Sequence, residues 1–135
     1  MKKRKETGQS LVEFALMLPI LLLILAGVLD LGRMFYSYIA VTDAAAEGAS
    51  YAAIYPNDSE GIMDRVQDAS GGLVVIDRNL ITVTCPTCPT IQTGDRVTVT
   101  VEYEYRMSTP IISAMVPNGV LLLRAVSSES ILATR

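Results

Sequence analysis

The sequence contains no histidine and only two cysteines among its 135 residues. Histidine is the side chain that most often serves as a catalytic base or a metal ligand near neutral pH. The cysteines belong to one motif, Cys85-Pro86-Thr87-Cys88, so a second pair of zinc ligands is missing. No phosphate-binding glycine loop and no nucleophile with a neighbouring base is recognisable. We therefore predict that the protein is not an enzyme and takes no cofactor, metal or small-molecule substrate.

Charge is also missing from a long apolar run near the N-terminus. The run extends from Leu11 to Leu29 and carries a single charge, Glu13, while the sixteen residues from Phe14 to Leu29 carry none. A helix needs roughly 20 residues to cross about 30 Å of hydrocarbon. We predict a transmembrane helix over residues 9–30.

Basic residues gather before this run, in a leader comprising residues 1–8. Lys and Arg beside a membrane-spanning helix stay in the cytoplasm, so we expect a single-pass protein of the cytoplasmic membrane, with its N-terminus inside and its C-terminal domain outside. Residues 9–135 hold seven Lys and Arg against thirteen Asp and Glu, a net charge of −6. This acidic balance argues against binding to nucleic acid.

A cleavable secretory signal is the competing interpretation of the apolar run. Such signals have a core of about 7–15 apolar residues, followed closely by small residues at alternate positions. Here Asp30-Leu31-Gly32-Arg33 follow the run and contain no small pair at that spacing. We therefore favour the membrane anchor.

The helical pattern continues beyond the predicted span. The breakers before Pro56 include Pro19, Gly27 and Gly32, which membrane helices tolerate, so we predict an extracytoplasmic continuation of the helix over residues 31–55. Side chains at spacings of four and three residues fall on one helix face and predict a packing surface. They are Leu31, Phe35, Tyr38, Thr42, Ala45, Ala49 and Ala52.

Residues 56–135 predict a small α+β extracytoplasmic domain. About 80 residues make a small core, so we expect this domain to bury apolar surface of the long helix as well. The fold class is α+β: a long N-terminal helix packed on a small antiparallel sheet of about three strands. The expected elements are a helix over 59–69, capped by Ser59 and stopped by Gly71-Gly72, and strands over 79–84, 96–105 and 120–131.

Glu13 is the residue that most needs an explanation. A carboxylate inside an apolar span costs about 2.5–3.5 kcal/mol on insertion scales and is a functional hypothesis by default. If the chain were cut after Gly8, Gln9 would carry a new α-amino group and Glu13 would become the fifth residue. That amine, from the same or a neighbouring subunit, could then pair with the carboxylate. The alternative is that Glu13 lies near the membrane surface, in contact with headgroups and water.

Asp30 and Arg33 stand at the predicted membrane exit. Their spacing of three residues allows an ion pair on one helix face. Most such pairs are solvated and contribute less than about 1 kcal/mol. The alternative is that the two residues mark the point where the helix leaves the lipid.

Cys85 and Cys88 form a candidate disulfide, since nearby thiols outside the cytoplasm are readily oxidised. A thioredoxin-like redox pair and half of a metal site are the alternatives, but the flanking residues favour a turn between strands. Glu102 and Glu104 alternate on one strand face and resemble a paired-carboxylate site. Neighbouring threonines favour a solvated face there instead.

Around Gly8, the sequence resembles the processing site of type IV pilins. Gly8 is followed by Gln9-Ser10-Leu11-Val12-Glu13-Phe14, and in such sites a prepilin peptidase cuts after glycine and leaves glutamate fifth. More closely, residues 8–19, 30–33 and 44–52 resemble the TadE-like family of the tight-adherence (Flp) pilus system. The resemblance covers roughly residues 4–53. It implies a pseudopilin or minor pilin with a membrane helix, cleavage between Gly8 and Gln9, and an assembly role for Glu13.

The favoured function is that of a pilin-like subunit for pilus assembly or secretion, acting through its N-terminal helix. The implied partners are the membrane, a prepilin-type peptidase, other pilin-like subunits and the pilus or secretion machinery. Whether it forms, primes or only assists an extracellular pilus stays open. A permanently anchored bitopic envelope protein with a partner-binding domain is the main alternative, and an envelope thiol oxidoreductase is a third.

Overall fold

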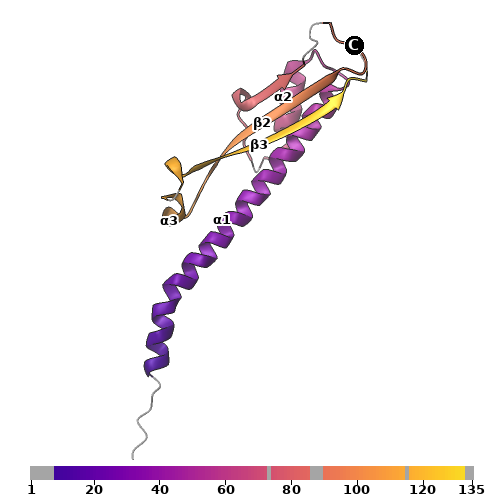
Figure 1. Ribbon diagram of the computed structural model, residues 1–135. Coiled ribbons are helices and arrows are strands. Elements are labelled where there is room, and N and C mark those ends of the chain that lie inside the picture. Colours follow the sequence, from indigo (N-terminus) through magenta and orange to yellow (C-terminus); the bar gives the residue numbers. More distant parts are fainter. Residues whose placement is uncertain (1–7, 73, 86–89, 115, 133–135) are drawn as a thin grey trace, which may run out of the picture.

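The computed structural model describes residues 8–72, 74–85, 90–114 and 116–132. One long helix carries a small domain beside its C-terminal half, and its N-terminal half extends away from that domain (Figure 1). The elements in chain order are α1 (Gln9–Ala52), α2 (Ser59–Ala69), η2 (Arg78–Leu80), β1 (Ile81–Thr84), β2 (Arg96–Arg106), α3 (Pro110–Ser113), η3 (Pro117–Gly119) and β3 (Val120–Ser130). The predicted α+β class is confirmed.

The sheet is a three-stranded antiparallel meander in the order β1-β2-β3. Alternate valines of β2, at positions 97, 99 and 101, are fully buried, while the threonines between them are only half-buried. Strands place successive side chains on opposite faces, so the strictly alternating sequence gives one core face. The strand predicted over residues 96–105 is confirmed, and it extends to Arg106.

Small residues make the C-terminal half of α1 a close-packing surface. Ala44, Ala45, Gly48, Ala49 and Ala52 are all buried against the sheet and α2. A Cβ atom added at Gly48 would lie 2.4 Å from Cγ2 of Val66 on α2. The absence of a side chain at this position therefore allows α2 to lie directly on α1.

The predicted packing face of α1 is wrong in its first half, from Leu31 to Thr42. Leu31, Phe35 and Tyr38 are 53%, 62% and 46% exposed, and Thr42 is also exposed. At this level the helix face that packs against the domain is shifted by one residue from the predicted one. It includes Asp30, Ser37 and Val41. Asp30 accepts hydrogen bonds from Tyr105 in β2 and from Thr109 in the segment after it, so polar contacts share this face with the buried Val41.

The predicted cap of the second helix is also wrong by one residue. Asp58 precedes α2, and its side chain accepts a hydrogen bond from the Gly61 amide at 3.0 Å. Aspartate is a better N-cap acceptor than a serine already inside the helix. The C-terminal end of α2 agrees with the prediction, since Gly71 and Gly72 follow the helix with φ of +67° and +72°. The long helix ends at Ala52, ahead of Pro56.

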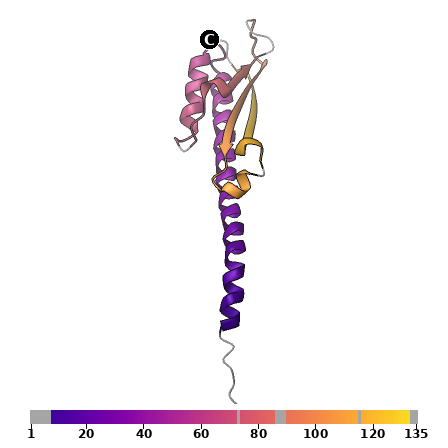
Figure 2. The ribbon, with the colours of Figure 1, turned by 90° about the vertical axis from the view of Figure 1, so that its left-hand side faces the viewer.

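The sheet runs alongside α1, with α3 at its lower end. Two views at right angles show α3 at the end of the domain nearest the N-terminal half of α1 (Figures 1 and 2). Below that level α1 continues without any neighbouring element. The molecule is thus divided into a bare helical half and a folded half that meet near Asp30.

Candidate functional site

The bare half of α1 is the first functional feature. Within the described residues, α1 is the one helix long and apolar enough to cross a membrane, and none of its most apolar 18-residue stretch is buried. A core helix of a soluble domain would be mostly buried, so that interpretation does not fit. The arrangement is compatible with a single-pass membrane anchor.

Glu13 lies on this bare half, one helical turn after Gln9. The Gln9 side-chain amide donates a hydrogen bond to the Glu13 carboxylate at 3.3 Å. Both residues are exposed, and among the described residues no group of the folded domain contacts them. Gln9 is also the first residue of α1, after Gly8. The helix therefore brings the predicted cleavage junction within one turn of the carboxylate.

Asp30 differs from its prediction as a solvated surface residue. It is only 7% exposed, and its carboxylate accepts a hydrogen bond from the Thr109 amide at 2.9 Å. The Asp30 carbonyl accepts a second one from the Tyr105 hydroxyl at 3.1 Å. Residues 30 and 109 are far apart in sequence, so these bonds attach the end of β2 and the segment before α3 to α1.

Arg33 binds Ser108 and does not form the predicted ion pair with Asp30. The Arg33 guanidinium donates to the Ser108 hydroxyl at 3.1 Å, and no ion pair with Asp30 is found among the described residues. Both members of the predicted pair instead bind residues 105–109. We call this set of three hydrogen bonds the exit clamp: Asp30–Thr109, Asp30–Tyr105 and Arg33–Ser108.

The clamp is partly shielded from water, and this changes the pKa of Tyr105. Burial raises the pKa of the Tyr105 phenol, and the nearby Asp30 charge raises it further. The neutral hydroxyl is therefore kept as a donor to the Asp30 carbonyl. The clamp is suited to positioning and contains no nucleophile with a neighbouring base.

The cysteine motif is only partly described. Cys85 is disulfide-bonded, while Cys88 lies outside the described residues, so the predicted pairing stays a prediction. Cys85 follows β1 directly, and β1 leads on to β2. No group of three or more potential metal ligands occurs in the part of the chain that the structure describes.

Glu102 and Glu104 do not form a carboxylate pair with a shared site. Glu102 faces Arg124 across the β2–β3 ladder, and their charged atoms are 3.6 Å apart. Glu104 lies opposite Leu122 and is exposed. The two acids thus belong to the outer face of the sheet.

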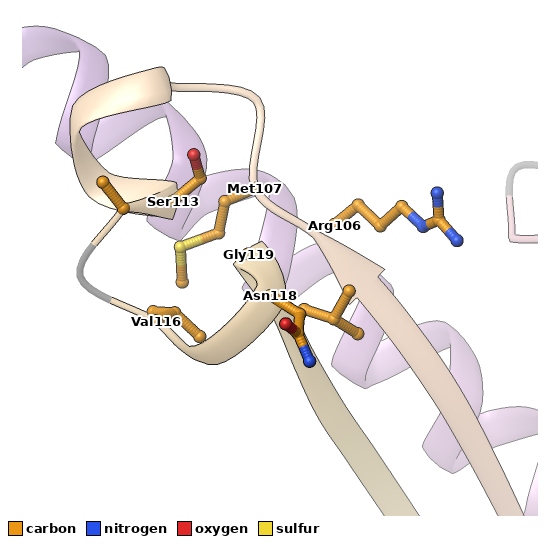
Figure 3. A pocket seen from close by; sticks show the side chains of 8 residues that line it. Arg106, Met107, Ser113, Val116, Asn118 and Gly119 are labelled. Atoms are coloured by element: carbon orange, nitrogen blue, oxygen red, sulfur yellow. The ribbon is translucent and has the colours of Figure 1, made fainter.

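Two open clefts lie at the lower end of the domain. One of about 680 Å³ lies between α3 and η3, where Met107 points into the space and Arg106 points away from it (Figure 3). The other, of about 590 Å³, lies between α1 and β2 and includes Arg33, Tyr36 and Arg106. Neither holds a cluster of catalytic groups.

The fold and these contacts define a class: a protein with one apolar helix that carries a small α+β domain at its far end. Comparison with known families then gives a more particular identification. Residues 8–50 match the family model of TadE-like proteins. This match covers the N-terminal helix, about a third of the chain, which is similar to TadE-like proteins and suggests a relation to the tight-adherence pilus. The comparisons with curated proteins and with solved structures found no match.

Sequence reasoning missed the clamp partners Tyr105, Ser108 and Thr109. Tyr105 ends the strand predicted over residues 96–105, and residues 108 and 109 lie between the predicted strands. Their partners lie more than seventy residues earlier, and no local pattern encodes such a contact. The signal present in the sequence was the position of Asp30 directly after the apolar run, which marks the residue but does not indicate its partners.

Proposed function

We propose that this protein is a pilin-like, membrane-anchored subunit of the tight-adherence type, a pseudopilin or minor pilin that assembles through its N-terminal helix and is not an enzyme. The observation that carries the proposal is the combination found in residues 8–50: a TadE-like match, a glycine directly before the helix, and a lone carboxylate one turn into a bare apolar surface. In this proposal the basic leader lies in the cytoplasm and the domain lies outside.

Processing between Gly8 and Gln9 is the first step of the proposed pathway. Gly8 is exposed, and a Cβ built there meets nothing within 4 Å. The junction is therefore open to a peptidase, and glycine offers no side chain that would clash in its site. The basic leader keeps the bond at the cytoplasmic face.

Assembly through α1 follows from its bare surface. A helix can exchange lipid for protein neighbours at little cost, because both surroundings are apolar. Glu13 then sets the height of each subunit, since an unpaired buried charge penalises any position where no amine meets it. Cleavage would supply such an amine at Gln9, whose side chain already reaches the carboxylate.

The mass of the mature chain tests this function. The full chain is expressed with a prepilin-type peptidase from the same system, and intact mass is measured on the membrane fraction. We expect wild type to begin at Gln9 and Gly8→Leu to retain its leader. Gly32→Leu is the matched control, because a Cβ atom there meets nothing within 4 Å, and it should be processed normally.

Retention of the leader on wild-type protein would favour the alternative, a permanently anchored bitopic envelope protein. In that case the domain, and not the helix, would be the partner-binding part. Loss of the leader in Gly8→Leu would also contradict the proposal, because it would show cleavage that does not depend on the glycine.

A further inference from the structure

The connection between β2 and β3 is unusually long for neighbouring antiparallel strands. It comprises the thirteen residues from 107 to 119, which include α3 and η3. Hairpin loops usually have about 2–5 residues, so this connection is much longer than joining the two strands requires. We call the described part of this connection, residues 107–114 and 116–119, the tip.

The tip has an unusual composition as well. No charged residue occurs from Met107 to Leu123, a stretch of seventeen residues, although 19% of the whole chain is charged. At that average about three charges would be expected here. Arginines flank the loop at Arg106 and, just beyond the uncharged stretch, at Arg124.

The exit clamp fixes the height of the tip along α1. Thr109, one residue before α3, is bonded to Asp30, which directly follows the apolar run. Figures 1 and 2 show α3 at the end of the domain that faces the bare half of α1. An uncharged loop is therefore held at the level where the span ends.

The depths agree with a position in the membrane surface layer. The headgroup region adds roughly 5–8 Å on each side of the hydrocarbon core. With the core ending at Leu29, Arg33 lies about 6 Å further along the helix, inside that layer. Arg33 and Arg106 line one cleft there with Tyr36. Tyrosine rings are favoured at this depth, and long basic side chains near the end of a span can reach the headgroups. The acids nearby are Glu104, which also lines the cleft, and Asp30, which is buried in the clamp.

From these observations we infer that the tip is a second membrane contact: the β2–β3 connection rests in the headgroup layer of the outer leaflet, beside the point where α1 emerges. The occupant of this surface is lipid. The inference rests on the proposed function in one respect, that α1 spans the bilayer. It follows that the domain is held at a fixed height and tilt, with the free end of the sheet pointing away from the membrane.

Fluorescent labels at three depths test the inference in the full chain, reconstituted in phosphatidylcholine–phosphatidylglycerol liposomes. A single cysteine is placed at Ala114 in the tip, Ser130 at the far end of β3 or Leu22 in the span, each with Cys85→Ser and Cys88→Ser. All three positions are exposed in the folded chain. Each cysteine carries an environment-sensitive dye, and quenching by lipids with a spin label near the headgroup is measured.

We expect severalfold stronger quenching and a blue-shifted emission at position 114 relative to position 130. Equal, water-like signals at 114 and 130, with a membrane-buried signal at 22, would overturn the inference and leave the anchor intact. A water-like signal at 22 would instead remove the anchor and with it the proposed function. Hydrogen exchange of the α3 amides gives a check without substitutions, since they should be slower in liposomes than in detergent.

Discussion

At the scale of single residues, Asp30 shows how one carboxylate can connect two parts of the chain. It follows directly on an apolar run, where an exposed charge would be expected to mark only the start of water. Instead the Asp30 carboxylate accepts a hydrogen bond from the Thr109 amide, and the Asp30 backbone carbonyl accepts one from the Tyr105 hydroxyl. The residue thereby sets where the domain meets the bare half of α1.

Replacing Asp30 tests the clamp. Asp30→Ala leaves the Thr109 amide without its acceptor, which should cost about 1–3 kcal/mol of local stability. Asp30→Asn keeps an acceptor oxygen and should cost less. The measurement is hydrogen-exchange protection of the Thr109 amide in the full chain in detergent. Unchanged protection in Asp30→Ala would contradict the clamp.

At the scale of elements, packing depends on small residues where α1 meets α2. Gly48 and Gly32 lie on the same helix, yet their surroundings differ completely. A Cβ at Gly48 would meet Val66 at 2.4 Å, whereas one at Gly32 meets nothing within 4 Å. The two positions form a natural pair for separating packing from helix propensity.

We predict opposite effects of alanine at these two glycines. Gly48→Ala should destabilise the domain by about 1–3 kcal/mol, because the added methyl forces α2 away. Gly32→Ala should be neutral or should stabilise by roughly 0.5–1 kcal/mol, because alanine favours the helix. Thermal unfolding of the full chain in detergent measures both. A stabilised Gly48→Ala variant would refute the close contact.

The start of α2 should be sensitive to pH. The Gly61 amide and then the Tyr51 hydroxyl hydrogen-bond to Asp58 and lower its pKa below the usual 3.8. A lowered carboxylate pKa stabilises the fold above the unfolded value, and this contribution is lost as the pH falls through the folded value. The same Asp58–Tyr51 bond raises the pKa of Tyr51 above 10. The stability that this bond contributes is therefore lost when the Tyr51 hydroxyl ionises, as the pH rises through the pKa of Tyr51 in the folded chain.

Asp58→Asn separates this titration from capping. Asparagine is also a good N-cap, but it does not ionise, so the variant should lose less stability than wild type between about pH 6 and pH 2. The melting temperature of the full chain at each pH is the measurement. Identical pH dependence in wild type and Asp58→Asn would show that the Asp58 charge contributes nothing to α2.

At the scale of the whole molecule, local patterns predicted most of the architecture. The alternation in β2 and the glycines after α2 are local signals, and the strand and the helix end were predicted correctly from them. The exposure of Leu31, Phe35 and Tyr38 was not predicted, because the partners that bind Asp30 and Arg33 on the neighbouring helix face lie more than seventy residues away in the sequence. Of the candidate site, Glu13 and the Gly8–Gln9 junction were visible in sequence, whereas the partners of Asp30 required the fold.

Glu13 is where the account can be tested most directly, because its carboxylate is a cost in lipid unless another group pairs with it. Glu13→Ala removes that cost of about 2.5–3.5 kcal/mol and should insert at least as well as wild type. It should nevertheless fail to associate, since nothing then sets the height of the helix.

The decisive measurement is the fraction of membrane-inserted chain that co-purifies with other pilin-like subunits after mild cross-linking, for wild type, Glu13→Ala and the control Glu129→Ala, an exposed acid near the far end of β3. We expect wild type and Glu129→Ala to associate equally, and Glu13→Ala to insert but not to associate. Association of Glu13→Ala at the wild-type level would contradict the assembly role of Glu13.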